Sequence, residues 1–121
     1  TQSEYYVYLR LAEQYLIRAE ARSHLNDVSG AQADVNTLRN RAGLVNTTAN
    51  DKISLLFAIE QERKVELFAE WGHRWFDLKR TNRANTLLSV LNPSTWQATD
   101  VLWPIPTSQL NLNPSLTQNP G

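Results

Sequence analysis

The spacing of apolar residues in the first third of the chain most constrains how it can fold. These residues recur at steps of four and three: Tyr5, Leu9, Ala12, Leu16 and Ala19. Such spacing places them on one face of an α-helix and predicts a helix from about Tyr5 to Leu25. A second stripe, formed by Tyr8, Leu11 and Tyr15, widens the buried face. We therefore expect this helix to pack against more than one neighbour.

A turn and a second helix follow. Residues 26–30 have the composition of a turn, and Asp27 or Ser29 can cap the next helix. One apolar face then continues until Gly43, a residue type that commonly ends helices. The members of this face are Ala31, Val35, Leu38 and Ala42. Two helices joined by so short a connection form an antiparallel hairpin, here predicted over residues 5–43.

The hairpin has some features of a tetratricopeptide unit. Ala19 and Ala31 are twelve residues apart, the spacing of the two small helix-contact positions in that repeat. Val35 and Leu38 fall where later apolar positions of the repeat lie. The early Trp and the closing Pro of the repeat are missing. An ordinary helical hairpin is equally compatible with this pattern.

Residues 51–91 are predicted to form further helices after a polar loop at 44–50. Asp51 can cap a third helix that runs to about Trp71. The chain is predicted to stay helical after Gly72 as far as Arg80, and a short helix is predicted over residues 85–91. The expected apolar side of the third helix consists of Ile53, Leu56, Phe57, Leu67 and Phe68.

The last part of the chain, residues 92–121, has a different character. Prolines from position 93 onward forbid long helices: Pro93, Pro104, Pro106, Pro114 and Pro120. Apolar residues between them predict an extended tail that packs on the helices. The predicted fold class is thus all-α, a single helical domain over residues 1–121 made of a tetratricopeptide-like hairpin, further helices and an extended Pro-rich tail.

A stripe of charges marks residues 63–77. If the helix continues through Gly72, positions 63, 66, 70, 74 and 77 fall within about 80° of arc at ~100° per residue. The stripe reads Arg, Glu, Glu, Arg, Asp, with opposite charges at helical contact spacing. One interpretation is an ion-pair ladder to neighbouring helices through Arg18 and Arg22. Because Arg outnumbers Lys nine to three, we expect ordered, bidentate ion pairs.

The other interpretation is a pair of catalytic carboxylates, Glu62 with Glu66 or Glu66 with Glu70, as in glycoside hydrolysis. Nearby arginines favour ionised carboxylates, whereas a general acid must hold a proton, so the structural interpretation is preferred. The two histidines, His24 and His73, have no metal-ligand spacing, and the chain has no cysteine. No catalytic, cofactor-binding or metal-binding motif is present in the sequence, so no enzyme and no cofactor is predicted.

The composition of the chain restricts the classes of partner that it can bind. Net charge is zero and no dense basic block is present, which argues against nucleic acid. No apolar run approaches the ~18 residues that span a bilayer. The chain starts at Thr1 and contains no Met, so we expect it to be a processed or excised piece.

Four tryptophans are candidates for ligand contact, because aromatic faces stack on the apolar faces of sugar rings. Trp71 and Trp75 lie on the predicted charged helix, where burial is expected. Trp103 lies in an apolar, Pro-flanked segment and is also expected to be packed. Trp96 follows a polar Asn-Pro loop and is the one weak candidate for a ligand-binding residue.

Four ordered pieces of sequence resemble the C-terminal region of the SusD/RagB family. They are residues 10–21 (Arg-Leu-Ala-Glu, then Leu-Ile-Arg-Ala-Glu-Ala), residues 38–44, residues 62–80 and the Pro-rich ending that begins at Trp103. The strongest match is Glu-Arg-Lys-Val-Glu-Leu at 62–67 followed by Glu-Trp-Gly-His-Arg-Trp-Phe-Asp-Leu-Lys-Arg at 70–80. The signature residues are Glu62, Arg63, Glu66, Glu70, Gly72, Arg74, Trp75, Asp77 and Arg80.

The resemblance implies a helical, tetratricopeptide-like binding protein that is not an enzyme. It implies a lipoprotein exposed on the outer membrane, with a SusC-type TonB-dependent transporter as partner and an oligosaccharide or other nutrient as ligand. The lipid-bearing cysteine is absent from this chain, and no family ligand-binding residue can be transferred to it. The signature residues are therefore expected to form scaffold. A helical-repeat scaffold for a peptide or protein partner is the alternative, and a glycosidase is a distant third.

Overall fold

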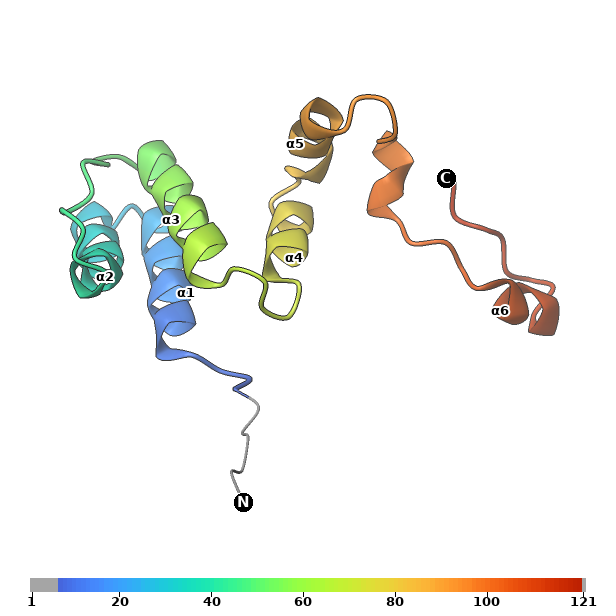
Figure 1. The fold of residues 1–121 in the computed structure, drawn as a ribbon, viewed down its shortest axis with the longest axis horizontal. Helices are drawn as coiled ribbons and strands as arrows, with labels where there is room; N and C mark the ends of the chain where they lie inside the picture. The colour runs from blue at the N-terminus through green and yellow to red at the C-terminus, as the bar shows by residue number, and fades with distance from the viewer. Residues whose placement is uncertain (1–6, 121) are drawn as a thin grey trace, which may run out of the picture. The chain divides into compact units, whose positions relative to one another are not determined.

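The structure is a computed structural model that describes residues 7–120 (Figure 1). The chain divides into two compact units between Arg74 and Trp75. The first holds α1 (Leu11–His24), α2 (Val28–Arg41) and α3 (Lys52–Glu66). The second holds α5 (Ala84–Leu91), the 3-10 helix η1 (Ala98–Val101) and α6 (Thr107–Leu112), and α4 (His73–Arg80) spans the division. No residue in the described range lies in a strand, so the all-α fold class is confirmed.

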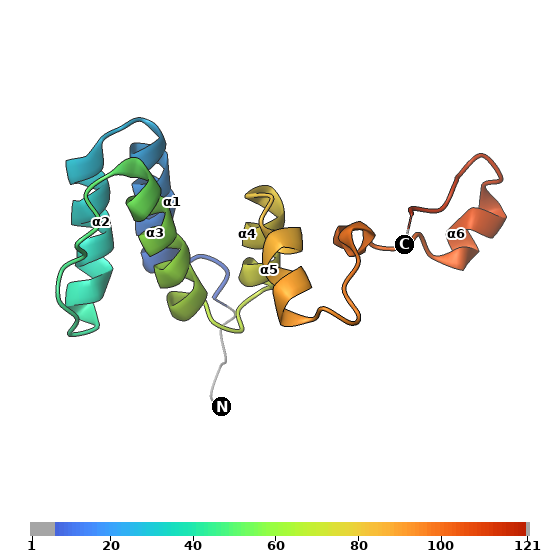
Figure 2. The ribbon, with the colours of Figure 1, turned by 90° about the horizontal axis from the view of Figure 1, so that it is seen from above.

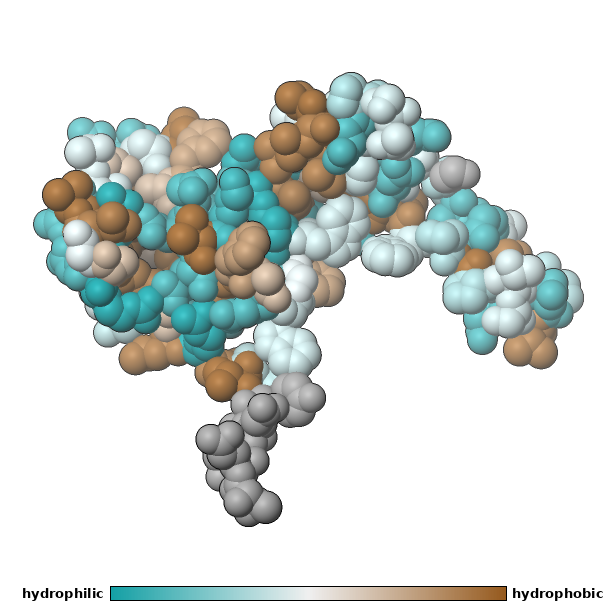
Figure 3. Space-filling model, in the orientation of Figure 1, coloured by the Kyte–Doolittle hydropathy of each residue, from teal (hydrophilic) through white to brown (hydrophobic). Residues whose placement is uncertain are grey.

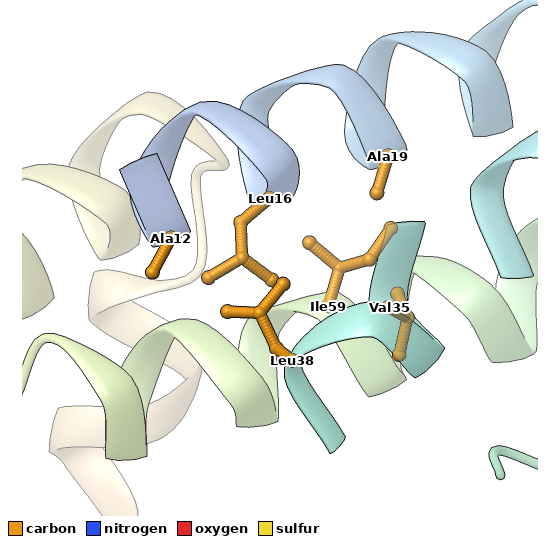
Figure 4. Packing of buried hydrophobic residues seen from close by; sticks show 6 residues of the cluster. All are labelled: Ala12, Leu16, Ala19, Val35, Leu38 and Ile59. Carbon is orange, nitrogen blue, oxygen red and sulfur yellow. The ribbon is translucent and has the colours of Figure 1, made fainter. Parts of the chain in front are cut away.

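Helices α1, α2 and α3 pack against one another in all three pairings, and they lie side by side in both ribbon views (Figures 1 and 2). Their core contains small and large residues from each helix: Ala12, Leu16, Ala19, Val35, Leu38 and Ile59 (Figure 4). Ala19 and Ala31 are both fully buried. Small side chains at these positions leave room for close helix packing, as their spacing predicted.

Helix α1 begins later than its apolar pattern predicted. Tyr5 lies outside the described residues, while residues 7–10 are not helical and Arg10 has extended backbone angles. Two contacts hold this segment away from a helix. The indole Nε1 of Trp71 donates a hydrogen bond to the carbonyl of Val7, and the Arg10 side chain reaches the end of α3.

Local capping interactions determine both the start and the end of α2, the second helix of the hairpin. Asp27 accepts a hydrogen bond from the amide of Gly30 at 3.0 Å and so caps α2, as expected. At the other end, Gly43 has φ of 73°. The amide of Leu44 donates to the carbonyl of Arg39 at 2.8 Å. This is the Schellman arrangement, which favours glycine because an L side chain is strained there.

Helix α3 has the predicted start but an earlier end. Asp51 and Ser54 form a capping box, whereas the helix stops at Glu66 and not near Trp71. Residues 67–72 turn instead, with positive φ at Ala69, Trp71 and Gly72. The prediction of continuous helix through this region was wrong, because periodicity does not reveal a left-handed turn.

The predicted apolar side of α3 was wrong in three of its five residues. Leu67 is buried and Leu56 is half-buried, whereas Ile53, Phe57 and Phe68 are each more than half exposed. The buried positions within the helix are Leu55, Ile59 and Arg63, which recur at steps of four. This face meets α1 and α2. The sequence offered two competing apolar faces on this helix, and the structure uses the one that carries the arginine.

The second unit confirms helix from His73 to Arg80 and a short helix close to the predicted bounds, over Ala84–Leu91. In the tail, η1 and α6 interrupt a segment that was expected to be extended throughout. Both helices are short, as the prolines require. Gln118 closes this segment on itself: its side-chain amide donates to the carbonyl of Ile105, and its side-chain oxygen accepts from the amide of Ile105. Gly121 lies outside the described residues, and packing of the tail on the helices stays a prediction.

Candidate functional site

The carboxylate of Glu66, the last residue of α3, binds two arginines. Its Oε1 accepts from Arg10 Nη2 and its Oε2 from Arg41 Nη2, each at 2.5 Å. Arg10 Nη1 also donates to the main-chain oxygen of Glu66 at 2.8 Å. A cation at this position satisfies a free carbonyl and complements the helix dipole. Glu66 therefore joins the end of α3 to the segment before α1 and to the end of α2.

Arg10 also binds Glu70 in the turn that follows α3, with Nη1 and Oε1 2.7 Å apart. The hydrogen bond that Arg10 donates to Glu70 raises the pKa of the guanidinium, and the charges of Glu70 and Glu66 raise that pKa further against the opposing effect of burial. Arg10 is therefore a permanent cation between two carboxylates. No such role was predicted for Arg10, although the excess of arginine pointed to bidentate pairing in general.

Other charged side chains of α3 form ion pairs with side chains of α1, α2 and the start of α4. Glu62 binds Arg39 of α2 at 2.5 Å, and Glu60 binds Arg74 at 2.9 Å. The buried Arg63 lies 3.6 Å from the carboxylate of Glu13 on α1. That same carboxylate oxygen lies 3.6 Å from His73 Nδ1. These ion pairs connect α3 to elements far away in the sequence.

The predicted geometry of the charged stripe was wrong in two respects. The turn at 67–72 separates Arg63 and Glu66 from Arg74 and Asp77, so the five positions do not form one continuous helical face. Arg18 and Arg22 do not supply the expected contacts, because both bind Asp34 of α2. Arg18 makes two hydrogen bonds to its carboxylate, at 2.9 and 2.6 Å, and Arg22 makes one at 2.7 Å.

In the second unit, Asp77 is buried and binds Arg80 at 2.9 Å, three residues later on α4. The side chain of Thr81 donates to the main-chain oxygen of Asp77 at 2.7 Å. These contacts complete the end of α4. A role for the signature residues as scaffold stays a prediction, and their geometry is compatible with it.

Trp96, the weak ligand candidate, is half-buried beside Trp75. The two rings meet edge to face, with centroids 6.4 Å apart. The indole Nε1 of Trp96 donates to Asn85 Oδ1 at 2.9 Å, and Lys79 Nζ lies 5.4 Å from the centre of the Trp75 ring. Trp96 is thus held by residues of its own unit, and ligand contact by it remains a prediction.

Two tryptophans were expected to be packed and are instead exposed. Trp71 is 54% exposed and Trp103 is 72% exposed. Trp71 lies in the turn after α3 and not on a helix face, which removes the basis of the expectation. Apolar side chains form separate patches between hydrophilic ones on the visible face (Figure 3).

No group of three or more His, Cys, Asp or Glu side chains within residues 7–120 has the geometry to hold a metal ion. Over the same range, no helix is both long and apolar enough to cross a bilayer.

A model of the SusD family matches residues 1–121. Two SusD-like proteins of Formosa agariphila are similar in sequence. P38 is 36% identical over 93% of this chain and 24% of its own length. P25 is 32% identical over 93% of this chain and 23% of its own length. The chain thus spans about a quarter of the length of these relatives.

Solved structures agree with the sequence matches. A SusD superfamily protein from Bacteroides vulgatus superposes with a TM-score of 0.79 at 24% identity, covering 92% of this chain and 26% of that one. That likeness shows the fold. A SusD-like protein from Bacteroides fragilis gives a TM-score of 0.76 at 30% identity, covering 93% of this chain and 25% of that one.

Proposed function

This chain belongs to the SusD family, and from that membership we propose that it is part of a nutrient-binding protein at the bacterial cell surface. The proposed nutrient is an oligosaccharide. The full-length protein is proposed to be lipid-anchored on the outer membrane and to pass its ligand to a SusC-type TonB-dependent transporter. The observation that carries this proposal is the family match over the whole chain.

Within that protein, we assign the described residues mainly to scaffold. The carboxylates of α3 are engaged by arginines from two other segments: Arg10 before α1, and Arg39 and Arg41 of α2. Partly buried ion pairs of this kind fix helix ends in place, because breaking one leaves the other charge without its partner. Such contacts support a rigid frame that holds a ligand site.

Binding is favoured over catalysis by the surroundings of Glu66. Glycoside cleavage requires one carboxyl group that can deliver a proton and a second that acts on the sugar or on water. Both oxygens of Glu66 accept hydrogen bonds from guanidinium groups. This geometry supports a structural carboxylate and offers no support for the general acid of a glycosidase.

Calorimetry of the full-length protein with a panel of oligosaccharides tests the proposal. We expect saturable binding to at least one glycan, with no cleavage of it. Co-purification of the full-length protein with a SusC-type transporter tests the proposed partner. Absence of binding to every glycan in the panel would overturn the assignment as an oligosaccharide-binding protein.

A second candidate function is a helical-repeat scaffold that binds a peptide. The fully buried Ala19 and Ala31 at the contact of the first two helices favour it, because they match the small positions of a tetratricopeptide unit. A peptide library in the same calorimetric experiment distinguishes the two. Peptide binding without glycan binding would favour the repeat scaffold.

A further inference from the structure

Two aromatic rings from distant parts of the sequence form an exposed stack in the first unit. Tyr8 precedes α1 and Trp71 follows α3, yet their ring centroids are 5.2 Å apart and their planes differ by 19°. Tyr8 is 70% exposed and Trp71 is 54% exposed. We call this pair the aromatic platform.

The backbone holds Trp71 in an uncommon conformation. Its φ is 42°, between Ala69 at 58° and Gly72 at 72°. Positive φ is rare for bulky residues, because the side chain crowds its own main chain, and such strain concentrates at functional sites. The indole is also fixed in direction, since Nε1 donates to the carbonyl of Val7 at 3.2 Å. The strained backbone of this turn therefore holds the exposed Trp71 ring in one orientation.

Two charged residues, Glu70 and Arg10, lie close in the sequence to the two rings of the platform, and their side chains are partly exposed to solvent. Glu70 immediately precedes Trp71, and Arg10 follows Tyr8 by two positions. The two side chains bind each other at 2.7 Å and are 34% and 31% exposed, respectively. Glu66 also binds Arg10, which keeps the guanidinium in place before any ligand arrives.

This combination matches the chemistry of a pyranose ring. The C–H face of a sugar is apolar and packs on an aromatic face, while its hydroxyl groups accept from guanidinium groups and donate to carboxylates. A partner that offered only apolar side chains would gain nothing from the charged pair beside the rings. The observations thus favour a carbohydrate over an apolar protein surface.

We infer that the aromatic platform, with Arg10 and Glu70 beside it, is a carbohydrate-contacting subsite that takes one sugar ring by stacking. This inference rests on the proposed function, because it locates one contact of the oligosaccharide that the whole protein binds. It replaces Trp96 with Trp71 and Tyr8 as the aromatic contacts to test first.

The test uses the full-length protein and an oligosaccharide that the wild type binds, measured by calorimetry. Trp71→Ala is expected to weaken binding by about tenfold or more, since loss of a stacked aromatic contact is of the order of one factor of ten in affinity. Tyr8→Ala is expected to weaken it less. The matched control is Trp103→Ala, which removes another exposed tryptophan and is expected to leave the affinity within about twofold.

Each outcome decides a separate question. If the wild type binds no glycan, the proposed function fails and the subsite fails with it. If the wild type binds and Trp71→Ala and Tyr8→Ala both bind like Trp103→Ala, the subsite is wrong and the proposed function stands. If thermal unfolding shows that Trp71→Ala is not folded at the temperature of the titration, Tyr8→Ala decides: weaker binding supports the subsite and unchanged binding overturns it.

Discussion

At the scale of single residues, the interior of the first unit depends on a few large side chains among small ones. Leu16 is completely buried and belongs to the cluster that joins α1, α2 and α3. Leu16→Ala is expected to lower the free energy of unfolding by about 2–5 kcal/mol, because it removes buried methyl groups and leaves a cavity. Urea denaturation measures this. Leu25→Ala, at a position 79% exposed, is the control, and an equal loss in both variants would contradict the packing.

The lowered pKa of Asp51 makes the stability of the fold depend on pH. Hydrogen bonds from the side chain and then the backbone of Ser54 are the main causes that hold its pKa below the ordinary value of 3.8. A depressed folded pKa means that the stabilisation is complete above 3.8 and is lost as pH falls through the lower folded value.

Asp51→Ala is therefore expected to lower the melting temperature at neutral pH, by an amount that shrinks in strong acid. Melting curves of the wild type and the variant from pH 7 to pH 2 measure the difference. Asp51→Asn is the control, because asparagine also caps helices but does not titrate in this range. A difference between wild type and Asp51→Ala that stays constant down to pH 2 would show that the charge of Asp51 has no such role.

At the scale of elements, the ends of helices are determined as much by backbone conformation as by apolar faces. Gly43 ends α2 with φ of 73°, and a Cβ at this position would meet no atom within 4 Å. Gly43→Ala is therefore expected to cost about 1 kcal/mol through backbone strain alone. Chemical denaturation measures it. Gly43→Asn should cost less, since asparagine tolerates this conformation better, and an equal cost for both would point to another cause.

The arginines at the end of α3 differ in how many groups they hold. Arg10 binds Glu66 and Glu70 and is 31% exposed, whereas Arg41 binds Glu66 and is 58% exposed. Arg10→Gln is expected to destabilise the first unit by about 1–3 kcal/mol, because it removes the charged donor of Glu70 and one of the two charged donors of the partly buried Glu66. Arg41→Gln should cost less than about 1 kcal/mol. The two urea midpoints decide, and the reverse order would contradict this account.

Elements that rest on repeated spacing could be predicted, and those that rest on single left-handed residues could not. The hairpin, its Asp27 cap and the Gly43 stop follow from local rules that act within a few residues. The turn at 67–72 breaks those rules, because Ala69 and Trp71 adopt positive φ that their residue types disfavour. The partners of Glu66 were missed for a different reason, since Arg10 lies 56 residues away and pairing over such distance leaves no local pattern.

At the scale of the whole molecule, the family followed from ordered motifs, while the site did not. The signature residues Glu62 and Glu66 belong to the motif that resembles the family, yet their contacts are with the chain itself. The exposed Trp71 belongs to the same stretch, and its exposure depends on a turn that the sequence did not predict. Motifs thus identified the kind of protein better than they located its surface.

A substitution of Glu66 in the full-length protein distinguishes a scaffold role for this residue from a catalytic one. Glu66→Gln is expected to lower the melting temperature, because it removes the charge that two arginines bind. Below that temperature, the variant is still expected to bind glycan, because Glu70 continues to hold Arg10. Melting curves and calorimetry on the same samples measure both. Glycan cleavage by the wild type that disappears in Glu66→Gln would contradict a scaffold role.

The pairing of Asp34 with Arg18 and Arg22 has a consequence for how the hairpin finds its alignment. Apolar ridges of two helices can interlock after a slide of one turn, because methyl groups accept many neighbours. A carboxylate held by three hydrogen bonds to two guanidinium groups has only one position along the helix where all three form. Arg18, Arg22 and Asp34 therefore fix the register of α1 relative to α2. Substitutions at positions 18, 22 and 34 should consequently be correlated among related sequences, while the leucines and valines beside them exchange freely.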